Sequence, residues 1–422
     1  MKNAFIILAI SIVLASAHLP AQNLLLKNAT VYTFDRGVLE GHDLLIEKGR
    51  ISKIGIGLRN PASYREIDLA GNSVIPGIID SHNHIGLLGG INEFSANVSS
   101  ETDMALQIQP DDPNIYYSLS GGVTMVHNMH GSANPIGGRN VTIKLKWGRE
   151  AEELFEKRAL PTLKMALGEN PKSANPPYPF PASRMGVAAV IRNAFNEAIA
   201  YRRAWTEYRR EGKKNPDLPS PRFDYRLEPL LQALDGKLPV RCHSYRAEES
   251  LELIRLSEEF GFRIAAFEHF HQAYRIADVL AEKGIAISVF ADSWNYKLEA
   301  AEYTPYGFQL LHEKGVEISL NSDTSEIMRR LYMEAGKMRR YAGMNDLEAL
   351  RTITLNPARL LGVESFTGSI SVGKEADLAV FDGHPLSSQS KCLLTIIEGE
   401  VFFDREADLK NRTAREKNGG TK

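Results

Sequence analysis

The sequence predicts a (β/α)8 barrel, a TIM-like α/β fold, joined to a small β-sandwich domain formed from both chain ends. Short β-prone runs, separated by glycines and charged turns, fill residues 23–74 and return at 361–408. Between residues 75 and 360, short apolar runs alternate with helix-period stretches, a pattern typical of parallel strands connected by helices. Because the strand-rich ends flank a different middle, we expect both termini to build one β domain.

The first 22 residues predict a signal peptide. One lysine precedes an apolar run from Ala4 to Leu14, which ends in the small residues of 15–17. No later stretch approaches the roughly 18 consecutive apolar residues of a membrane-spanning helix. We therefore expect a secreted or periplasmic protein without a membrane span in its mature part, ending in a polar tail at 409–422.

The composition excludes several classes of partner. The chain has 422 residues and a formal net charge of −2, so no basic surface for nucleic acid is expected. Two cysteines, Cys242 and Cys392, are too few for a disulfide framework. Neighbours on a strand point to opposite faces, so we interpret Cys242 as buried beside His243 rather than as a ligand. A small-molecule substrate is expected, and association into a homo-oligomer is left open.

Five chemistry-bearing residues stand at the carboxyl ends of apolar runs. His82 and His84 follow the run in VIPGIIDSHNHIG and, being two residues apart on a strand, project to the same side. His243 ends LPVRCHS, His269 ends FRIAAFEH and Asp323 ends GVEISLNSD. In barrels of this class the carboxyl ends of the strands form the catalytic face. Converging imidazoles and a carboxylate suit a divalent metal, with zinc favoured.

The segment PGIIDSHNH resembles the Pro-Gly-x-x-Asp-x-His-x-His signature of the amidohydrolase superfamily, and the chain is most similar to its imidazolonepropionase-like branch. The flanking β domain and the later His, His and Asp agree with this resemblance. It implies a metal-dependent hydrolase acting on carbon–nitrogen bonds other than ordinary peptide bonds. Cyclic amides, N-acyl amino acids and dipeptides are the substrate types expected.

The resemblance also implies a role for each residue. His82 and His84 would be ligands of the buried metal, and His243 and His269 the histidines after the fifth and sixth strands. Asp323 would both bind the metal and move the proton. The catalytic residues are then Asp323 and His269, the latter polarising the carbonyl if the metal does not.

One or two metal ions are expected. Two-metal members add a carboxylated lysine or a glutamate after the fourth strand, and LKMALGENPK offers Lys164 or Glu169. A zinc-type ion lowers the pKa of bound water from about 15.7 to about 7, and Asp323 would take up the proton. His271 is an alternative to His269, because the two would lie on one side of a strand. We prefer His269, which directly ends the apolar run.

Residues in the loops that follow the strands are candidates for substrate binding. Guanidinium groups suit a carboxylate, so an acidic substrate is weakly favoured. The glycine-rich loop TMVHNMHGSANPIGGRN adds two histidines that we interpret as substrate-loop residues. The candidates are Arg139, Arg184, Tyr245 and Arg246, with His130 and its neighbour His127.

Two alternatives to a hydrolase of amides remain. A metal-activated hydroxide can also attack an amidine carbon, which makes a deaminase the nearest alternative among enzymes. A barrel that binds metal or ligand without turnover is the other. An intact Asp323 argues against it, because a binding protein needs no proton shuttle.

Overall fold

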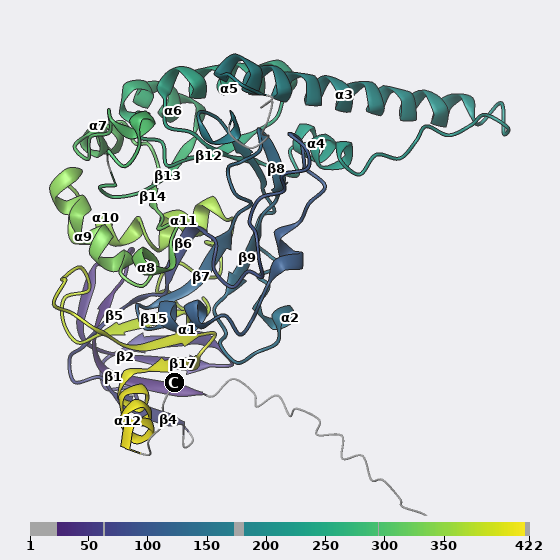
Figure 1. Cartoon of the computed structure of the whole chain (residues 1–422). Coiled ribbons are helices and arrows are strands. Elements are labelled where there is room, and N and C mark those ends of the chain that lie inside the picture. The colour runs from purple at the N-terminus through teal and green to yellow at the C-terminus, as the bar shows by residue number, and fades with distance from the viewer. Residues whose placement is uncertain (1–22, 62–63, 173–180, 294, 418–422) are drawn as a thin grey trace, which may run out of the picture.

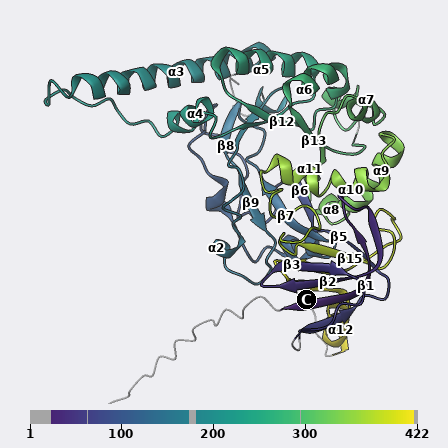
Figure 2. The same cartoon turned by 180° about the vertical axis from the view of Figure 1, so that it is seen from behind.

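A computed structural model describes residues 23–61, 64–172, 181–293 and 295–417 of the chain. The predicted signal peptide at 1–22 lies outside the described residues. Figure 1 has a β-rich part at the bottom and an α/β part above it, and Figure 2 gives the same arrangement from behind. Within these ranges, no helix combines the length and the apolar character needed to cross a membrane.

The β-rich part is one mixed sheet of eight strands drawn from both chain ends. Seven strands run in the order β17-β16-β15-β5-β1-β2-β3, and β4 pairs with β1. The two ends of the chain meet where β5 pairs antiparallel with β15, so purple and yellow strands lie together in Figure 1. The strands are β1 (Leu24–Tyr32), β2 (Val38–Glu47), β3 (Arg50–Gly55), β4 (Arg65–Asp68), β5 (Ser73–Pro76), β15 (Leu378–Phe381), β16 (Cys392–Ile397) and β17 (Glu400–Asp404).

This sheet differs from the predicted sandwich because its strands are joined by continuous hydrogen bonding. The first half of β1 pairs with β4 and its second half with β5, both in parallel. The register against β2 shifts around Asn28, whose φ is 53°, which lets one long strand serve both neighbours. Buried residues from both ends, among them Leu26, Leu44, Leu378 and Ile396, share one apolar cluster.

The α/β part contains the parallel strands that the alternating pattern predicts. β10 to β14 are parallel in sequence order, and β6 pairs parallel with β7. Their residues are fully buried, as expected where helices cover parallel strands. The strands are β6 (Ile78–Asn83), β7 (Val123–Asn128), β8 (Ile136–Arg139), β9 (Val141–Lys144), β10 (Leu163–Ala166), β11 (Val240–His243), β12 (Ile264–Glu268), β13 (Ala286–Val289) and β14 (Ile318–Leu320).

The predicted closed ring of eight strands is not formed by strand pairing among the described residues. The strands instead form two sheets: one of six strands in the order β14-β13-β12-β11-β10-β8, and one of three in the order β6-β7-β9. The segment after β7 turns back, so β9 runs antiparallel to β7 and β8 antiparallel to β10. Backbone hydrogen bonds cross both seams, from the Asn140 amide to the Thr162 carbonyl at 3.0 Å and from the Asp323 amide to the His82 carbonyl at 3.1 Å.

Helices surround these strands, and α3 projects far beyond the body of the molecule in Figures 1 and 2. α12 continues to Lys417, so the predicted polar tail at 409–422 is helical as far as that residue. The domain boundaries stay a prediction. The helices are α1 (Pro113–Leu119), α2 (Ala151–Leu154), α3 (Arg184–Glu211), α4 (Leu227–Leu234), α5 (Ala247–Phe260), α6 (Ala277–Lys283), α7 (Gly307–Glu313), α8 (Ser325–Met328), α9 (Leu331–Tyr341), α10 (Asp346–Arg351), α11 (Leu355–Leu360) and α12 (Arg405–Lys417), with short 3₁₀ turns η1 (Met104–Gln107), η2 (Asn170–Lys172), η3 (Ala273–Ile276) and η4 (Leu298–Ala300).

Candidate active site

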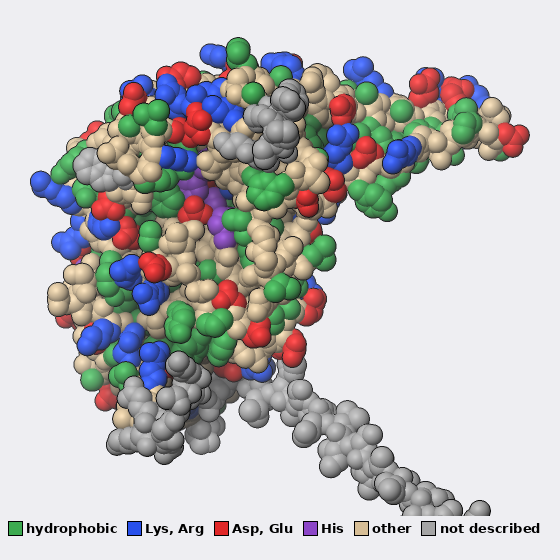
Figure 3. All heavy atoms as spheres, in the orientation of Figure 1, with side chains coloured by type: hydrophobic (Ala, Val, Ile, Leu, Met, Phe, Trp, Pro, Cys, Tyr) green, Lys and Arg blue, Asp and Glu red, His purple; other side chains and the backbone are tan. Residues whose placement is uncertain are grey.

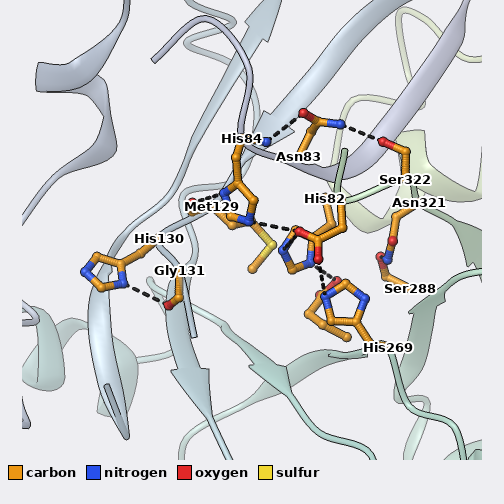
Figure 4. A network of polar contacts seen from close by, with 12 residues as sticks. His82, Asn83, His84, Met129, His130, Gly131, His269, Ser288, Asn321 and Ser322 are labelled. Carbon is orange, nitrogen blue, oxygen red and sulfur yellow. Dashed lines mark hydrogen bonds and ion pairs between the residues drawn. The ribbon is translucent and has the colours of Figure 1, made fainter. Parts of the chain in front are cut away.

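Two histidines and an aspartate meet at the seam between β6 and β14. His84 Nε2 lies 3.0 Å and His82 Nε2 3.5 Å from Asp323 Oδ1. One ligand atom from each of the three lies within 4.8 Å of the others, an arrangement that can hold a metal ion. Figure 4 shows the rings of His82 and His84 turned toward this point, with His269 beside them. His269 Nε2 is 3.6 Å from Asp323 Oδ2.

The backbone is strained at two of these residues. His269 and Asp323 have φ values of 57° and 53°, in the left-handed region that side-chain-bearing residues rarely adopt. Each follows the last residues of a buried strand, and the turn aims its side chain across the strand ends. Strain of this kind persists where surrounding structure enforces it, and it gathers at functional sites.

A buried network holds the first histidine in place. Glu268 Oε2 lies 2.9 Å from His82 Nδ1, and its other oxygen accepts from Arg241 Nε. Asp80 accepts from the amides of His82 and Ser322, so it ties the end of β6 to the segment after β14. Carboxylates behind a ligating histidine fix its tautomer and orientation. From the sequence alone, no role was assigned to Asp80, Arg241 or Glu268. Their positions within apolar runs could have indicated that these charged side chains are buried.

The protonation states suit metal ligation. Burial pulls the pKa of His82, His243 and His269 well below the ordinary range, so these imidazoles are neutral near pH 7. Burial alone would raise the pKa of Asp323, yet His269 and the hydrogen bond from His84 hold it well below its usual value. The cluster therefore presents neutral nitrogens around an ionised carboxylate.

Lys164 lies in this cluster, and Glu169 has its contacts elsewhere. The Lys164 side chain is fully buried on β10, with Nζ 3.5 Å from His82 Nε2. Burial lowers the pKa of this amine to about 8. Glu169 is half-exposed and forms ion pairs with Lys172 and Arg184. Of the two residues offered for a bridging role, the structure places Lys164 among the histidines.

His243 and His271 are buried without hydrogen-bond partners at either ring nitrogen among the described residues. The His243 ring packs edge-on against His269, with centroids 5.3 Å apart, and lines the cavity beside the cluster. His271 instead packs among Tyr245, Tyr303 and Phe290. Of the alternative pair, His269 rather than His271 therefore contacts Asp323.

A cavity of about 720 Å³ opens onto the cluster. Figure 3 shows it as a hollow in which purple histidine atoms are visible from outside. Its walls combine apolar side chains with polar groups, as expected for a small-molecule site. It is lined by His84, Ile91, Asn92, Gly131, Ser132, Asn170, His243, Tyr245, Phe290, Asp292, Ser293, Tyr296, Lys297, Ser322, Asp323, Thr324 and Ile327.

The three predicted substrate-binding arginines do not line this cavity. Arg184 is held by Glu169, Glu249 and Glu299, carboxylates that are distant in sequence. Arg246 lies 3.5 Å from Glu248, its neighbour on α5. The backbone of Arg139 forms an isolated β-bridge with that of Asp103 at the edge of the six-stranded sheet.

The two histidines predicted to lie in a substrate loop both contact the protein itself: His127 lies on β7 and His130 just after it. His130 Nδ1 lies 3.0 Å from the Gly131 carbonyl, and its Nε2 accepts from the Glu93 amide. His127 contacts Thr142 and Thr162 through its two nitrogens, so it joins the sheets across their seam. Neither histidine lines the cavity.

Tyr245 is the predicted substrate residue that does line the cavity. It is 3% exposed, and its hydroxyl lies 2.6 Å from that of Tyr296. Lys297, which sequence reasoning missed, adds the one lysine or arginine among the described lining residues. No periodic pattern marks the loop of Tyr296 and Lys297, so the sequence offered no signal for them.

The architecture is shared with a solved protein. A crystal structure of an amidohydrolase from Thermotoga maritima superposes with a TM-score of 0.82, at 35% identity, over 90% of this chain and 100% of that one. The chain belongs to the amidohydrolase family. The model of the Amidohydrolase family itself matches residues 237–408.

Curated relatives of this amidohydrolase agree. Amidohydrolase tasK from Hapsidospora irregularis is 32% identical over 88% of the chain, although the chain spans only 41% of the length of that relative. Imidazolonepropionase from Thermoplasma acidophilum is 25% identical, covering 88% of this chain and 91% of its own. The family expected from PGIIDSHNH, with its imidazolonepropionase-like relatives, is thus confirmed.

Proposed function

We propose that this amidohydrolase is a metal-dependent enzyme that hydrolyses a carbon–nitrogen bond other than an ordinary peptide bond. Cyclic amides, N-acyl amino acids and dipeptide-like compounds are the substrate types. The observation that carries the proposal is the convergence of His82, His84 and Asp323 beside an open cavity. The neutral histidines and the ionised carboxylate fit a divalent ion, for which we propose zinc.

The residues divide the chemistry among them. His82, His84 and Asp323 would hold the ion, and His243 and His269 complete the set. A divalent metal bound there supplies a lowered pKa for water and a polarised carbonyl. Asp323, whose side chain is 31% exposed and faces the cavity, takes the proton of the attacking water and returns it to the leaving nitrogen. Glu268 keeps His82 oriented through Nδ1.

Lys164 is the proposed bridging group of a two-metal site. Its lowered pKa leaves much of the amine unprotonated near pH 8, and a neutral amine adds to carbon dioxide with loss of one proton. The product is a carbamate, an anionic ligand placed among the histidines. Lys164→Met should then bind one metal ion fewer than the parent. Glu169→Ala is the matched control and should bind as many as the parent, by elemental analysis.

Export is part of the proposal and rests on the apolar start of the chain. N-terminal sequencing of the native protein should find a start near His18 or Asn23. A native protein that begins with Met1 contradicts export and leaves the hydrolase proposal untouched.

The experiment that tests the activity is a substrate panel. The metal-loaded protein is incubated with N-acyl amino acids, dipeptides, lactams and amino-substituted heterocycles, and release of amine or ammonia is measured. Turnover of an amide or lactam supports the proposal. Turnover of the heterocycles alone identifies a deaminase, and no turnover together with tight binding identifies a binding protein.

A further inference from the structure

Part of the cavity lining is polar. There Lys297 lies beside Asn170, Tyr245 and Tyr296, all of which line the same cavity as Asp323. Its ammonium is 4.0 Å from the centre of the Tyr245 ring and 5.8 Å from that of Tyr296. These aromatic faces give the lysine a defined direction along the cavity wall.

The Lys297 charge is poorly compensated by the protein. Among the described residues, its hydrogen-bond partner is Asn170 Oδ1 at 3.0 Å, a neutral group. The nearest carboxylate, that of Glu299, is 3.9 Å away, and it is closer to Arg184 and to the Glu169 amide. A half-buried ammonium without an anion at hydrogen-bond distance is a favourable place for an incoming anion.

The other charges around the cavity are already matched. Asp292 is paired with Lys337 at 2.8 Å, and Arg184 with three glutamates. Asp323 belongs to the histidine cluster. Among the described lining residues, Lys297 is therefore the cation left for a ligand.

We propose that Lys297 binds a carboxylate of the substrate, so that the amides hydrolysed here are acidic ones. The inference rests on the proposed function, since it assigns the scissile bond to Asp323 and the carboxylate to Lys297 in the same cavity. One ammonium, assisted by the neutral Asn170 amide, matches a singly charged carboxylate better than a doubly charged phosphate. The Tyr245 ring faces the ammonium and holds it in place along the cavity wall.

The test compares acids with their neutral counterparts. Each acidic amide of the panel is assayed beside its carboxamide, in which the carboxylate is replaced by CONH₂. The parent should prefer the acid. Lys297→Met should lose about tenfold to a hundredfold in kcat/KM on the acid, mainly through KM, and change less than about twofold on the carboxamide.

Two further variants separate recognition from structure. Lys297→Arg keeps a cation and should retain most of the preference for acids, whereas Lys172→Met removes an ion-paired lysine outside the cavity lining and should match the parent. Equal losses by Lys297→Met on acid and carboxamide would mean a merely structural lysine. A parent that prefers the carboxamide would also overturn the inference.

Binding provides a readout that needs no turnover. Glutarate and glutaramide are titrated by calorimetry into metal-loaded parent and Lys297→Met, so any contribution of the metal is common to both. The parent should bind glutarate more tightly than glutaramide, and the variant should lose that difference. If this holds while no amide is hydrolysed, the carboxylate site stands and the proposed hydrolase fails. If the variant keeps the difference, the inference fails by itself.

Discussion

Two buried lysines, Lys144 and Lys164, show how similar sequence features can lead to opposite roles. Lys144 Nζ lies within 3.0 Å of carboxylate oxygens of Glu375, Asp377 and Glu398. Although burial alone would lower the pKa of Lys144, these carboxylates raise it. Lys164 has no such partner at contact distance among the described residues, and burial lowers its pKa to about 8.

The two lysines also lie beside two different groups of potential metal ligands. Glu156, Glu375 and Glu398 have the spacing of a metal site, as do His82, His84 and Asp323. The glutamates, however, are neutralised by Lys144 and Arg158 and join the α/β part to the β sheet. Beside the histidine cluster, His243 and His269 have ring nitrogens without a hydrogen-bond partner among the described residues, and a cavity opens there. A charge cluster completed by the protein stabilises the fold, whereas an incomplete one has room for a ligand.

The largest expected effect is on turnover, from Asp323→Asn. Asparagine keeps the size and one oxygen ligand but cannot take a proton, so turnover should fall by about 10² to 10⁴ or more. The comparison uses a substrate from the panel at saturating metal, with metal content and folding measured in parent and variant. A fully metal-loaded variant as fast as the parent would exclude Asp323 as the proton carrier.

Lys144→Met should lower the stability of the fold and leave turnover unchanged, the opposite of Asp323→Asn. Removing one partner of a buried ion-pair network leaves uncompensated carboxylates, so the free energy of unfolding should fall by about 3–5 kcal/mol. Turnover per folded molecule should stay close to the parent value. Urea unfolding measures the first quantity and active-site titration the second. Lys146→Met, which removes a partly exposed partner of Glu398 alone, is the control and should cost about 1 kcal/mol or less.

A smaller effect is expected on the acid side of the stability curve. Burial would raise the pKa of Glu398, but Lys144 and Lys146 lower it to about 2, from an ordinary value of 4.5. Because the folded-state pKa is depressed, this stabilisation is present above about pH 4.5 and is lost as the pH falls toward 2. Urea unfolding of Glu398→Gln between pH 6 and pH 2.5 should give a shallower decline than the parent. Parallel curves would mean that Glu398 does not contribute.

Strand alternation and the positions of strand ends were sufficient to bring the five main site residues together. His82, on β6, and His84, directly after it, are two residues apart, and His243, His269 and Asp323 follow from the parallel order of strands. The choice between Lys164 and Glu169 could not be made from spacing. It depends on which side chain is enclosed, and that depends on packing between distant segments.

Other features escaped sequence reasoning for similar reasons. The sequence predicts that Arg184 binds an anionic substrate. In the structure, Arg184 forms ion pairs with Glu249 and Glu299, which are more than sixty residues away in sequence. The chain reverses direction at β8 and β9, and the expected ring of strands is therefore not closed. The sequence PIGGRNVTIK does not indicate whether these residues form antiparallel strands or a loop. Lys297 stands in an irregular segment, where periodicity has no predictive value.

The most direct test of the central claim is the metal content of matched variants from the two clusters. Parent, His84→Ala and Glu375→Gln are loaded with zinc, freed of excess metal and analysed for bound ions per folded chain. His84 is the more exposed of the two strand-end histidines, so its variant is expected to fold. The account predicts at least about one ion in the parent, well under one in His84→Ala and the parental amount in Glu375→Gln. Full metal in His84→Ala, or loss of metal from folded Glu375→Gln, would contradict it.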